Sequence, residues 1–194
     1  MSRIVVGVSG ASGIILGYRM VEALALAGHH VHLVLSKGAC FTAIEELGTE
    51  YASGEKWMKL YSKEVQKRVT CHSISDFSAS IASGSFLTDG MIVIPCSMAS
   101  LAAIALGLAD NLLRRAADVV LKERRPFIVV PREAPLSEIH LENMLKITRM
   151  GGVVLPPMPA WYLHPKNMDD VESFIVARAF DALKLKSPPA KRWE

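Results

Sequence analysis

The residues that open the chain have the types and the spacing to hold an anion. The apolar run from Ile4 to Val8 breaks into a small-residue turn, Ser9 to Gly13, and a helical pattern follows. Where a buried parallel strand ends in such a turn, free backbone N–H groups and the positive end of the helix dipole meet at one point. The turn therefore indicates a phosphate ligand, although the same residues also suit a plain strand-to-helix turn.

The glycine spacing in this turn argues against a dinucleotide. Gly7, Gly10 and Gly13 depart from the G-x-G-x-x-G order in which a pyrophosphate approaches the backbone. The second apolar run ends in Ser36 and Lys37, so the acidic residue that would hold an NAD ribose is missing from its usual place. We therefore expect a mononucleotide.

Further candidates directly follow the other apolar runs, because ligands of an open parallel sheet bind beyond the carboxyl ends of its strands. Arg132 and Glu133 stand between two prolines after such a run, where charged side chains have little packing role, and a catalytic or anion-binding function is favoured. Ser97 and Ser100 suit helix capping as well as they suit ligand contact. The candidates are Ser12, Ser36, the segment Pro95–Ser100, Arg132, Glu133 and the segment Pro156–Tyr162.

Several charged residues on expected helices have two interpretations. Arg115 and Lys122 are seven residues apart, hence on one stripe of a helix. They can bind a phosphate or complement the negative end of the helix dipole, and the second interpretation is favoured. Arg178 is either an exposed helix residue or an inward-facing anion ligand. For Glu45 and Glu46 a solvated helix face is favoured.

Positioning these residues requires a parallel sheet, and the hydrophobic pattern predicts one. Apolar runs of strand length alternate with helical segments, the order typical of a doubly wound α/β fold. Strands are expected at Ile4–Val8, Val31–Leu35, Met91–Pro95, Phe127–Val130 and Val153–Leu155. Helices are expected at Ile14–Ala27, Gly38–Leu47, Lys56–Gln66, Ser97–Leu106, Leu112–Arg124, Ser137–Met150 and Met168–Leu183. We predict one Rossmann-like domain over residues 1–185 and an extended tail over 186–194, with Trp193 as its docking residue.

Composition narrows the classes of function. The 194 residues are 51% hydrophobic with a net charge of +3, and the basic residues lie scattered among carboxylates, so nucleic-acid binding is not indicated. Neither a secretory leader pattern nor an apolar stretch of the roughly 18–20 residues that span a bilayer is visible. The cysteines and histidines lack metal-ligand spacing. We expect a cytoplasmic protein with reduced thiols, without a metal and without membrane association.

Five segments, taken together and in order, resemble the UbiX-type flavin prenyltransferases. They are Gly10–Gly13 (GASG), Ile94–Met98 (IPCSM), Arg115–Glu123 (RAADVVLKE), Pro131–Pro135 (PREAP) and Ile139–Leu145 (IHLENML). Several long motifs in the right order are far more specific than one glycine-rich turn. The resemblance covers roughly Arg3 to Trp193 and extends to the small B subunit encoded with phenolic acid decarboxylases, which belongs to the same enzyme class.

This resemblance implies a reaction and a site. Reduced FMN would accept the dimethylallyl group of dimethylallyl phosphate, first at flavin N5 and then by ring closure at C6, without a metal. The implied FMN contacts are Gly10, Ala11, Ser12, Ser36, Ser97, Met98, Ala99, Ser100 and Arg132. The implied ligands of the prenyl phosphate are Arg115, Lys122, Tyr162 and Arg178, and the implied catalytic residues are Ser12, Glu46, Lys122 and Glu133. Phe77 falls where some members place a Trp over the prenyl group.

The resemblance also implies an assembly and a recipient for the product. Members form homo-oligomers, typically dodecamers with sites at trimer contacts, so Arg115 or the helix that carries Arg178 can reach a neighbour's ligand. The prenylated FMN would serve a UbiD-type decarboxylase.

Two other functions stay open. An FMN-dependent cysteine decarboxylase of the related flavoproteins shares the fold and a Pro-x-Ser-x motif, but it uses a catalytic His and an Asn-Met motif where this chain has Pro131–Pro135. A non-catalytic FMN carrier subunit for a partner decarboxylase would bind flavin and leave its mass unchanged.

Overall fold

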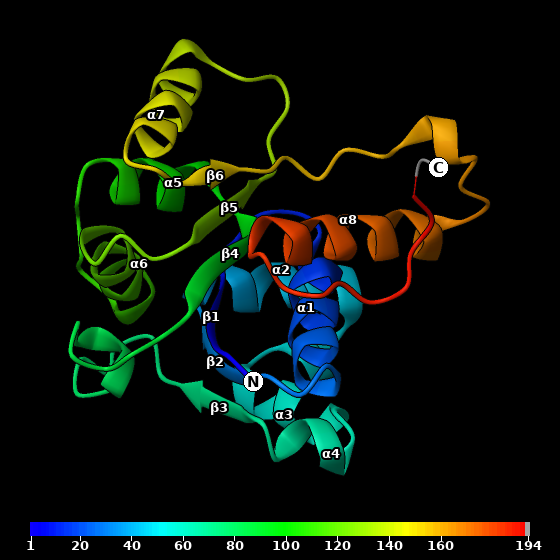
Figure 1. The fold of residues 1–194 in the computed structure, drawn as a ribbon, viewed down its shortest axis with the longest axis horizontal. Helices are drawn as coiled ribbons and strands as arrows, with labels where there is room; N and C mark the ends of the chain where they lie inside the picture. Colours follow the sequence, from blue (N-terminus) through cyan, green and yellow to red (C-terminus); the bar gives the residue numbers. More distant parts are fainter. Residues whose placement is uncertain (193–194) are drawn as a thin grey trace.

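Parallel strands form the sheet in the computed structural model, which describes residues 1–192 (Figure 1). In the described chain the sheet has six strands in the order β3-β2-β1-β4-β5-β6, and every neighbouring pair is parallel. The strands are β1 (Arg3–Val8), β2 (His30–Leu35), β3 (Val69–His72), β4 (Gly90–Cys96), β5 (Phe127–Pro131) and β6 (Val153–Val154). From β1 the chain continues to β2 and β3 on one side of the sheet, and from β4 it continues to β5 and β6 on the other. Ligands of such folds bind between β1 and β4, where this direction reverses.

Helices cover both faces of this sheet. Figure 1 shows α5, α6 and α7 on one side and α1 and α8 on the other. The α-helices are α1 (Ile14–Leu26), α2 (Lys37–Leu47), α3 (Gly54–Leu60), α4 (Lys63–Gln66), α5 (Met98–Ala105), α6 (Leu112–Lys122), α7 (Glu138–Arg149) and α8 (Met168–Ala182). Short 3-10 helices are η1 (Thr49–Tyr51), η2 (Ser80–Ala82) and η3 (Trp161–Leu163).

The two faces of β1 divide the hydrophobic core. Ile4, Val6 and Val8 are fully buried in a cluster with residues of α1, α2 and α8, whereas Val5 is buried in a second cluster with residues of α5 and α6. Because successive side chains of a strand point to opposite faces, a strand covered on both sides must be apolar throughout. This burial is the physical reason that the central strands are continuous apolar runs.

The expected doubly wound α/β architecture is confirmed, and the expected strands and most helices lie within one or two residues of their observed bounds. Two expectations were wrong. The edge strand β3 was not predicted, because it is four residues long and only its first residue, Val69, is buried. The helix expected over Lys56–Gln66 is two helices, α3 and α4, because the backbone of Tyr61 is extended and Ser62 caps α4. The Tyr61 side chain is buried, and its hydroxyl donates to the carbonyl of Tyr18 at 3.0 Å.

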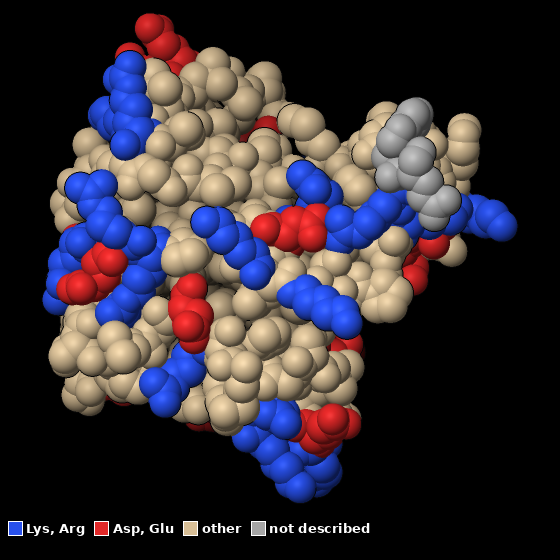
Figure 2. Space-filling view, in the orientation of Figure 1, with Lys and Arg blue, Asp and Glu red and all other residues tan. Residues whose placement is uncertain are grey.

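The charged side chains act in local groups. On the face drawn in Figure 2, Lys and Arg lie among Asp and Glu, with uncharged surface between the groups. Residues 186–192 contain neither helix nor strand, and Arg192 reaches back from this tail to Asp181, with Nη2 and Oδ1 2.9 Å apart. Trp193, the docking residue expected from the sequence, lies outside the described residues. Within residues 1–192, no helix is both long and apolar enough to cross a membrane.

A pair of histidines joins β2 to β3. His32 Nδ1 and His72 Nε2 are 2.9 Å apart, and the two rings stack with their centroids 5.2 Å apart. Burial, and after it the positive charges of His72, Arg3 and His30, together lower the pKa of His32 to about 4. Burial also lowers the pKa of His72. Both rings are therefore neutral in the folded protein at neutral pH.

We predict that the folded state loses stability as pH falls from about 6.5 towards 4. In this range His32 takes up a proton in the unfolded chain but not in the folded one, so acid favours unfolding. The partly exposed ring should contribute on the order of 1–2 kcal/mol. Urea unfolding across this range should show a weaker pH dependence for His32→Gln than for the native chain or the exposed His164→Gln control. Equal slopes for the two variants would contradict this assignment.

Candidate functional site

Ser9 joins the turns that follow β1 and β4. Its side chain is fully buried, its hydroxyl donates to the carbonyl of Pro95 at 3.2 Å, and it accepts a hydrogen bond from the backbone N–H of Ser97 at 2.7 Å. The N–H of Ser36, at the end of β2, donates to the carbonyl of Val8 at 2.9 Å. The turns after β1, β2 and β4 are thus held together at the carboxyl edge of the sheet.

A cavity of about 570 Å³ opens at this edge. It brings together six of the residues singled out from the sequence: Gly10, Ser36, Phe77, Ser97, Ala99 and Ser100. Its other lining residues are Lys37, Gly38, Ile74, Ser75, Asp110, Asn111, Leu113 and Arg114. The cavity therefore combines hydroxyls and charged groups with an apolar wall that includes the half-exposed ring of Phe77.

The close approach of two turns explains the glycine at position 10. A Cβ atom on Gly10 would lie 2.8 Å from the carbonyl carbon of Gly38, a distance that real Cβ atoms essentially never show. The backbones of the β1 and β2 turns are therefore in direct contact, and their N–H groups can approach a ligand without side chains between them.

Three helices begin at the cavity wall. Ser36 caps α2, Ser97 caps α5 and Asn111 caps α6, and each side chain accepts a backbone N–H of the first turn. Each helix N-terminus carries a partial positive charge of about half a unit. Their convergence makes the cavity favourable for a phosphate, and it shows that the capping and the ligand-contact interpretations of Ser97 are compatible.

The N-terminus of α1 already holds an anion from the protein. The carboxylate of Glu46, on α2, accepts hydrogen bonds from the N–H of Gly13 at 3.0 Å and of Ile14 at 2.9 Å. Glu46 is exposed, as the solvated-face interpretation expected, but that interpretation did not include this cap on α1. The expectation that the first turn of α1 offers free N–H groups to a phosphate is corrected as well, because Glu46 accepts the N–H groups of Gly13 and Ile14. The cavity is lined by Gly10, earlier in the turn after β1, and not by Gly13.

Other expected contacts lie at the same edge without lining the cavity. Ala11 and Ser12 belong to the β1 turn, Met98 begins α5, and Arg132 follows β5. The N–H of Arg132 donates to the carbonyl of Cys96 at 3.2 Å, which ties the β5 turn to the end of β4. Arg132 and Glu133 are exposed, as charged residues available to a ligand must be.

The two expected phosphate ligands on α6, Arg115 and Lys122, do not line the cavity. Arg115 donates through Nε to the carbonyl of Ala82 at 3.0 Å and pairs with Asp118 at 2.6 Å. Lys122 pairs with Glu123, whose pKa is lowered by this hydrogen bond, and it lies against Gly84. Since α6 returns towards the start of β5, Lys122 is about 15 Å along the helix from the end that meets the cavity.

The remaining expected phosphate ligands lie on the opposite face of the sheet. Arg178 projects from α8 and pairs with Asp181 at 3.0 Å. Tyr162 belongs to η3, which lies in the arm, residues 155–167, that connects β6 to α8. Its side chain is half exposed. Hence Arg115, Lys122, Tyr162 and Arg178 do not form one cluster within a single chain.

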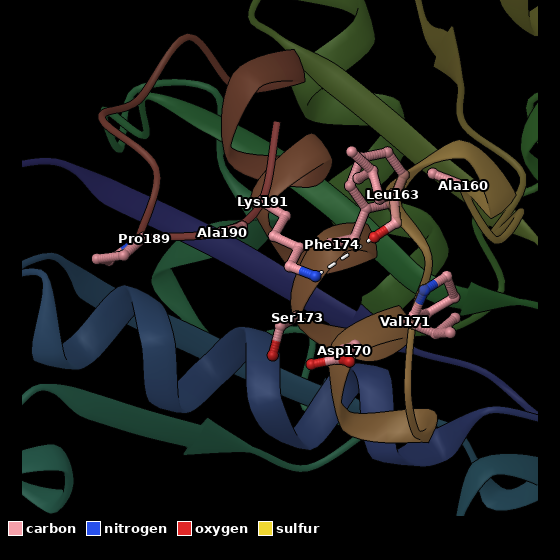
Figure 3. Close-up of a pocket in the computed structure, with 10 residues that line it drawn as sticks. Ala160, Leu163, Asp170, Val171, Ser173, Phe174, Pro189, Ala190 and Lys191 are labelled. Atoms are coloured by element: carbon pink, nitrogen blue, oxygen red, sulfur yellow. Dashed lines mark hydrogen bonds between the residues drawn. The ribbon is translucent and has the colours of Figure 1, made fainter. Parts of the chain in front are cut away.

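A smaller cavity of about 220 Å³ lies where this arm meets α8 and the tail. Figure 3 shows Lys191 of the tail, which donates to the carbonyl of Leu163 at 3.4 Å, next to Phe174 of α8. Apolar side chains of η3, α8 and the tail line the cavity. These contacts hold the segment that carries Tyr162 against the rest of the fold.

Sequence reasoning did not single out Asp110, Asn111 and Arg114 as parts of this edge, nor the hydrogen bonds by which Ser9 joins two turns. The signal for the three residues was the N-cap pattern Asp110-Asn111-Leu112 before an amphipathic helix. A helix that returns between parallel strands begins near their carboxyl ends, so its cap lies close to any ligand there. Ser9 had no sequence signal beyond its place at the end of a strand.

Comparison with known proteins identifies the family. The Flavoprotein family model matches residues 1–180. A flavin prenyltransferase UbiX of Chlamydia trachomatis is 48% identical over 194 residues, which cover 100% of this chain and 98% of the relative. A probable UbiX-like flavin prenyltransferase of Bacillus subtilis is 47% identical, over 98% of this chain and 89% of the relative. This chain belongs to the UbiX-type flavin prenyltransferases.

Solved structures agree with this membership of the UbiX-type flavin prenyltransferases. A dodecameric FMN-dependent UbiX-like decarboxylase of Escherichia coli O157:H7 superposes with a TM-score of 0.89 at 48% identity, covering 99% of both chains. A UbiX crystallised with FMN and dimethylallyl pyrophosphate has a TM-score of 0.87 at 42% identity, covering 100% of this chain and 97% of the other. A PPC decarboxylase, 19% identical with a TM-score of 0.62, shares the fold alone.

We predict that Glu46→Gln lowers the free energy of unfolding by about 1 kcal/mol, because it removes the charge that complements the N-terminus of α1. The adjacent Glu45→Gln is the matched control, since it removes the same charge from α2 without touching the α1 cap. Urea denaturation measures both variants. Equal stability of the two would show that the Glu46 contact contributes nothing to α1.

Proposed function

We propose that this chain is a flavin prenyltransferase that joins the dimethylallyl group of dimethylallyl phosphate to reduced FMN. The observation that carries the proposal is the cavity at the carboxyl edge, where three helix N-termini and the hydroxyls of Ser36, Ser97 and Ser100 converge. It lies in a chain that is 48% identical over its full length to a flavin prenyltransferase.

The residues present fit FMN. The uncovered backbones of Gly10 and Gly38 allow close approach, and the N-termini of α2, α5 and α6 favour a doubly charged phosphate. The cavity also has an apolar wall, with Ile74, Phe77 and Leu113, suited to a flat aromatic ring. We assign the FMN contacts to Gly10, Ala11, Ser12, Ser36, Ser97, Met98, Ala99, Ser100 and Arg132.

Reduced FMN supplies the nucleophilic N5 and the carbon C6 that the prenyl group joins. Departure of an allylic phosphate needs cations on the leaving group, and we assign this role to Arg115, Lys122 and Arg178, with Tyr162 as a hydroxyl ligand. An aromatic, water-poor wall at Phe77 stabilises the cation-like prenyl fragment. We assign proton handling to Glu46 and Glu133, beside Ser12, because these carboxylates lie at the turns after β1 and β5.

We propose that a complete phosphate site combines residues of neighbouring chains. Arg115 and Lys122 are on α6 and Arg178 is on α8, which cover opposite faces of one sheet. No rotation of these side chains brings them together, so an assembly with several copies must do so. Exposed apolar residues along α7, among them Ile139, Leu141 and Leu145, support such an assembly, and a close structural neighbour is a dodecamer. We therefore propose that the chain forms a homo-oligomer and, more specifically, a dodecamer.

The wider setting follows from the same function. We propose a UbiD-type decarboxylase as the recipient of the prenylated FMN. We also propose a cytoplasmic location, which the three free cysteines support: Cys40 and Cys71 are half-buried and Cys96 is buried, as suits reduced thiols.

The proposed function predicts a change in the mass of the flavin. Anaerobic incubation of the protein with reduced FMN and dimethylallyl phosphate should yield an extracted flavin heavier by one five-carbon prenyl unit. Mass spectrometry of the flavin makes this measurement, and a reaction without protein is the control. Tight FMN binding with unchanged flavin mass would reject the transferase and favour the carrier or the cysteine decarboxylase.

A composite site predicts complementation between inactive variants. Lys122→Ala and Arg178→Ala should each lose prenyl transfer while retaining FMN. After the two are denatured and refolded together, about a quarter of the sites should carry both native residues from two different chains, and a similar share of the activity should return. Mixing each variant with itself is the control. Activity no higher than in these controls would reject sharing of the site.

A further inference from the structure

We propose that Arg114 binds the phosphate of FMN and makes this chain prefer FMN to the phosphate-free flavin, riboflavin. The proposal rests on the function proposed above, because it concerns the same cavity. Arg114 was not among the contacts expected from the sequence or implied by the family motifs, which begin at the next residue, Arg115. Its assignment comes from the position and the hydrogen bonds of its side chain.

Arg114 lies in the first turn of α6, at the cavity wall. Its backbone N–H donates to Oδ1 of the cap residue Asn111 at 3.1 Å, and its side chain lines the cavity together with Ser36, Lys37 and Ser97. The Arg114 side chain is only 21% exposed. A cation therefore stands next to the positive end of α6, where the helix dipole disfavours it unless an anion is close.

Asp110 is the anion that holds Arg114 in this structure. Nη1 of Arg114 lies 2.7 Å from Oδ1 and 2.8 Å from Oδ2 of Asp110, and Oδ1 also accepts from Nδ2 of Asn111 at 3.2 Å. The Asp110 side chain is 64% exposed, so its attraction is screened by solvent. This pairing orients the guanidinium and uses only one of its nitrogens.

The Nε atom of Arg114 has no acceptor. It is buried. Among the described residues it is the only buried side-chain nitrogen or oxygen atom that has no hydrogen-bond partner. An unpaired buried donor is costly, and on a charged group more so, so such groups are rare unless a ligand completes them. The unused charged donor thus belongs to a side chain that lines a cavity which already favours phosphate.

A phosphate oxygen is the acceptor that fits this donor. A guanidinium binds phosphate through two neighbouring N–H groups, and charge-assisted bonds of this kind are about twice as strong as neutral ones. Lys37, the first residue of α2, adds a second positive charge on the same wall, and Asp110 is the one carboxylate among the described residues that line it. The phosphate end of FMN is the part of the ligand that supplies matching negative charge, and riboflavin lacks it.

The test compares the affinities of variants for FMN and for riboflavin, measured by quenching of flavin fluorescence. Arg114→Gln should weaken FMN binding about 10- to 100-fold and leave riboflavin binding within about 2-fold of the native protein. Arg114→Lys keeps the charge and the pairing with Asp110 but lacks Nε–H, so its affinity for FMN should be intermediate. Lys67→Gln, an exposed cation after α4 at the far edge of the sheet, is the matched control and should change neither affinity.

The outcomes separate this inference from the function on which it rests. Unchanged FMN affinity in both Arg114 variants, or equal weakening of FMN and riboflavin, would overturn the role of Arg114 while native FMN binding and prenyl transfer still support the function. Failure of the native protein to bind FMN would instead overturn the proposed function. If Arg114→Gln does not fold, the comparison of Arg114→Lys with the native chain decides, since selective loss of FMN affinity is expected there too.

Discussion

Parallel pairing of β1 with both β2 and β4 is the constraint on which the rest of this structure depends. It places the ends of three strands at one edge, and the buried hydroxyl of Ser9 then holds the β1 and β4 turns together. Gly10 and Gly38 let the β1 and β2 turns touch. The cavity lies at this edge, where α2, α5 and α6 begin.

Electrostatics then distinguishes the helix N-termini at this edge. That of α1 is neutralised by Glu46, so the protein provides its anion there. Those of α2, α5 and α6 face the cavity, and Arg114 adds a guanidinium with an unused donor. The positive potential is therefore concentrated at the cavity, where an external phosphate is the suitable counter-charge.

The sheet also separates cations that the proposed reaction requires together. Cations on α6 and on α8 lie on opposite faces, and a sheet covered by helices cannot let them meet. Exposed apolar residues along α7 indicate that further copies of the chain complete the surface. Under the proposed function, quaternary structure is thus the level at which flavin binding by one chain becomes prenyl transfer.

The sequence by itself determined the architecture, because strands buried on both faces must be continuous apolar runs, and it determined the family through motifs such as Arg115–Glu123 and Pro131–Pro135. It did not reveal β3, an edge strand with little buried surface. Only the tertiary structure decided that Glu46 caps α1 and that Arg114 lines the cavity, because both depend on which surfaces face each other after packing. Spacing along one helix defines a stripe of residues, but not what that stripe meets.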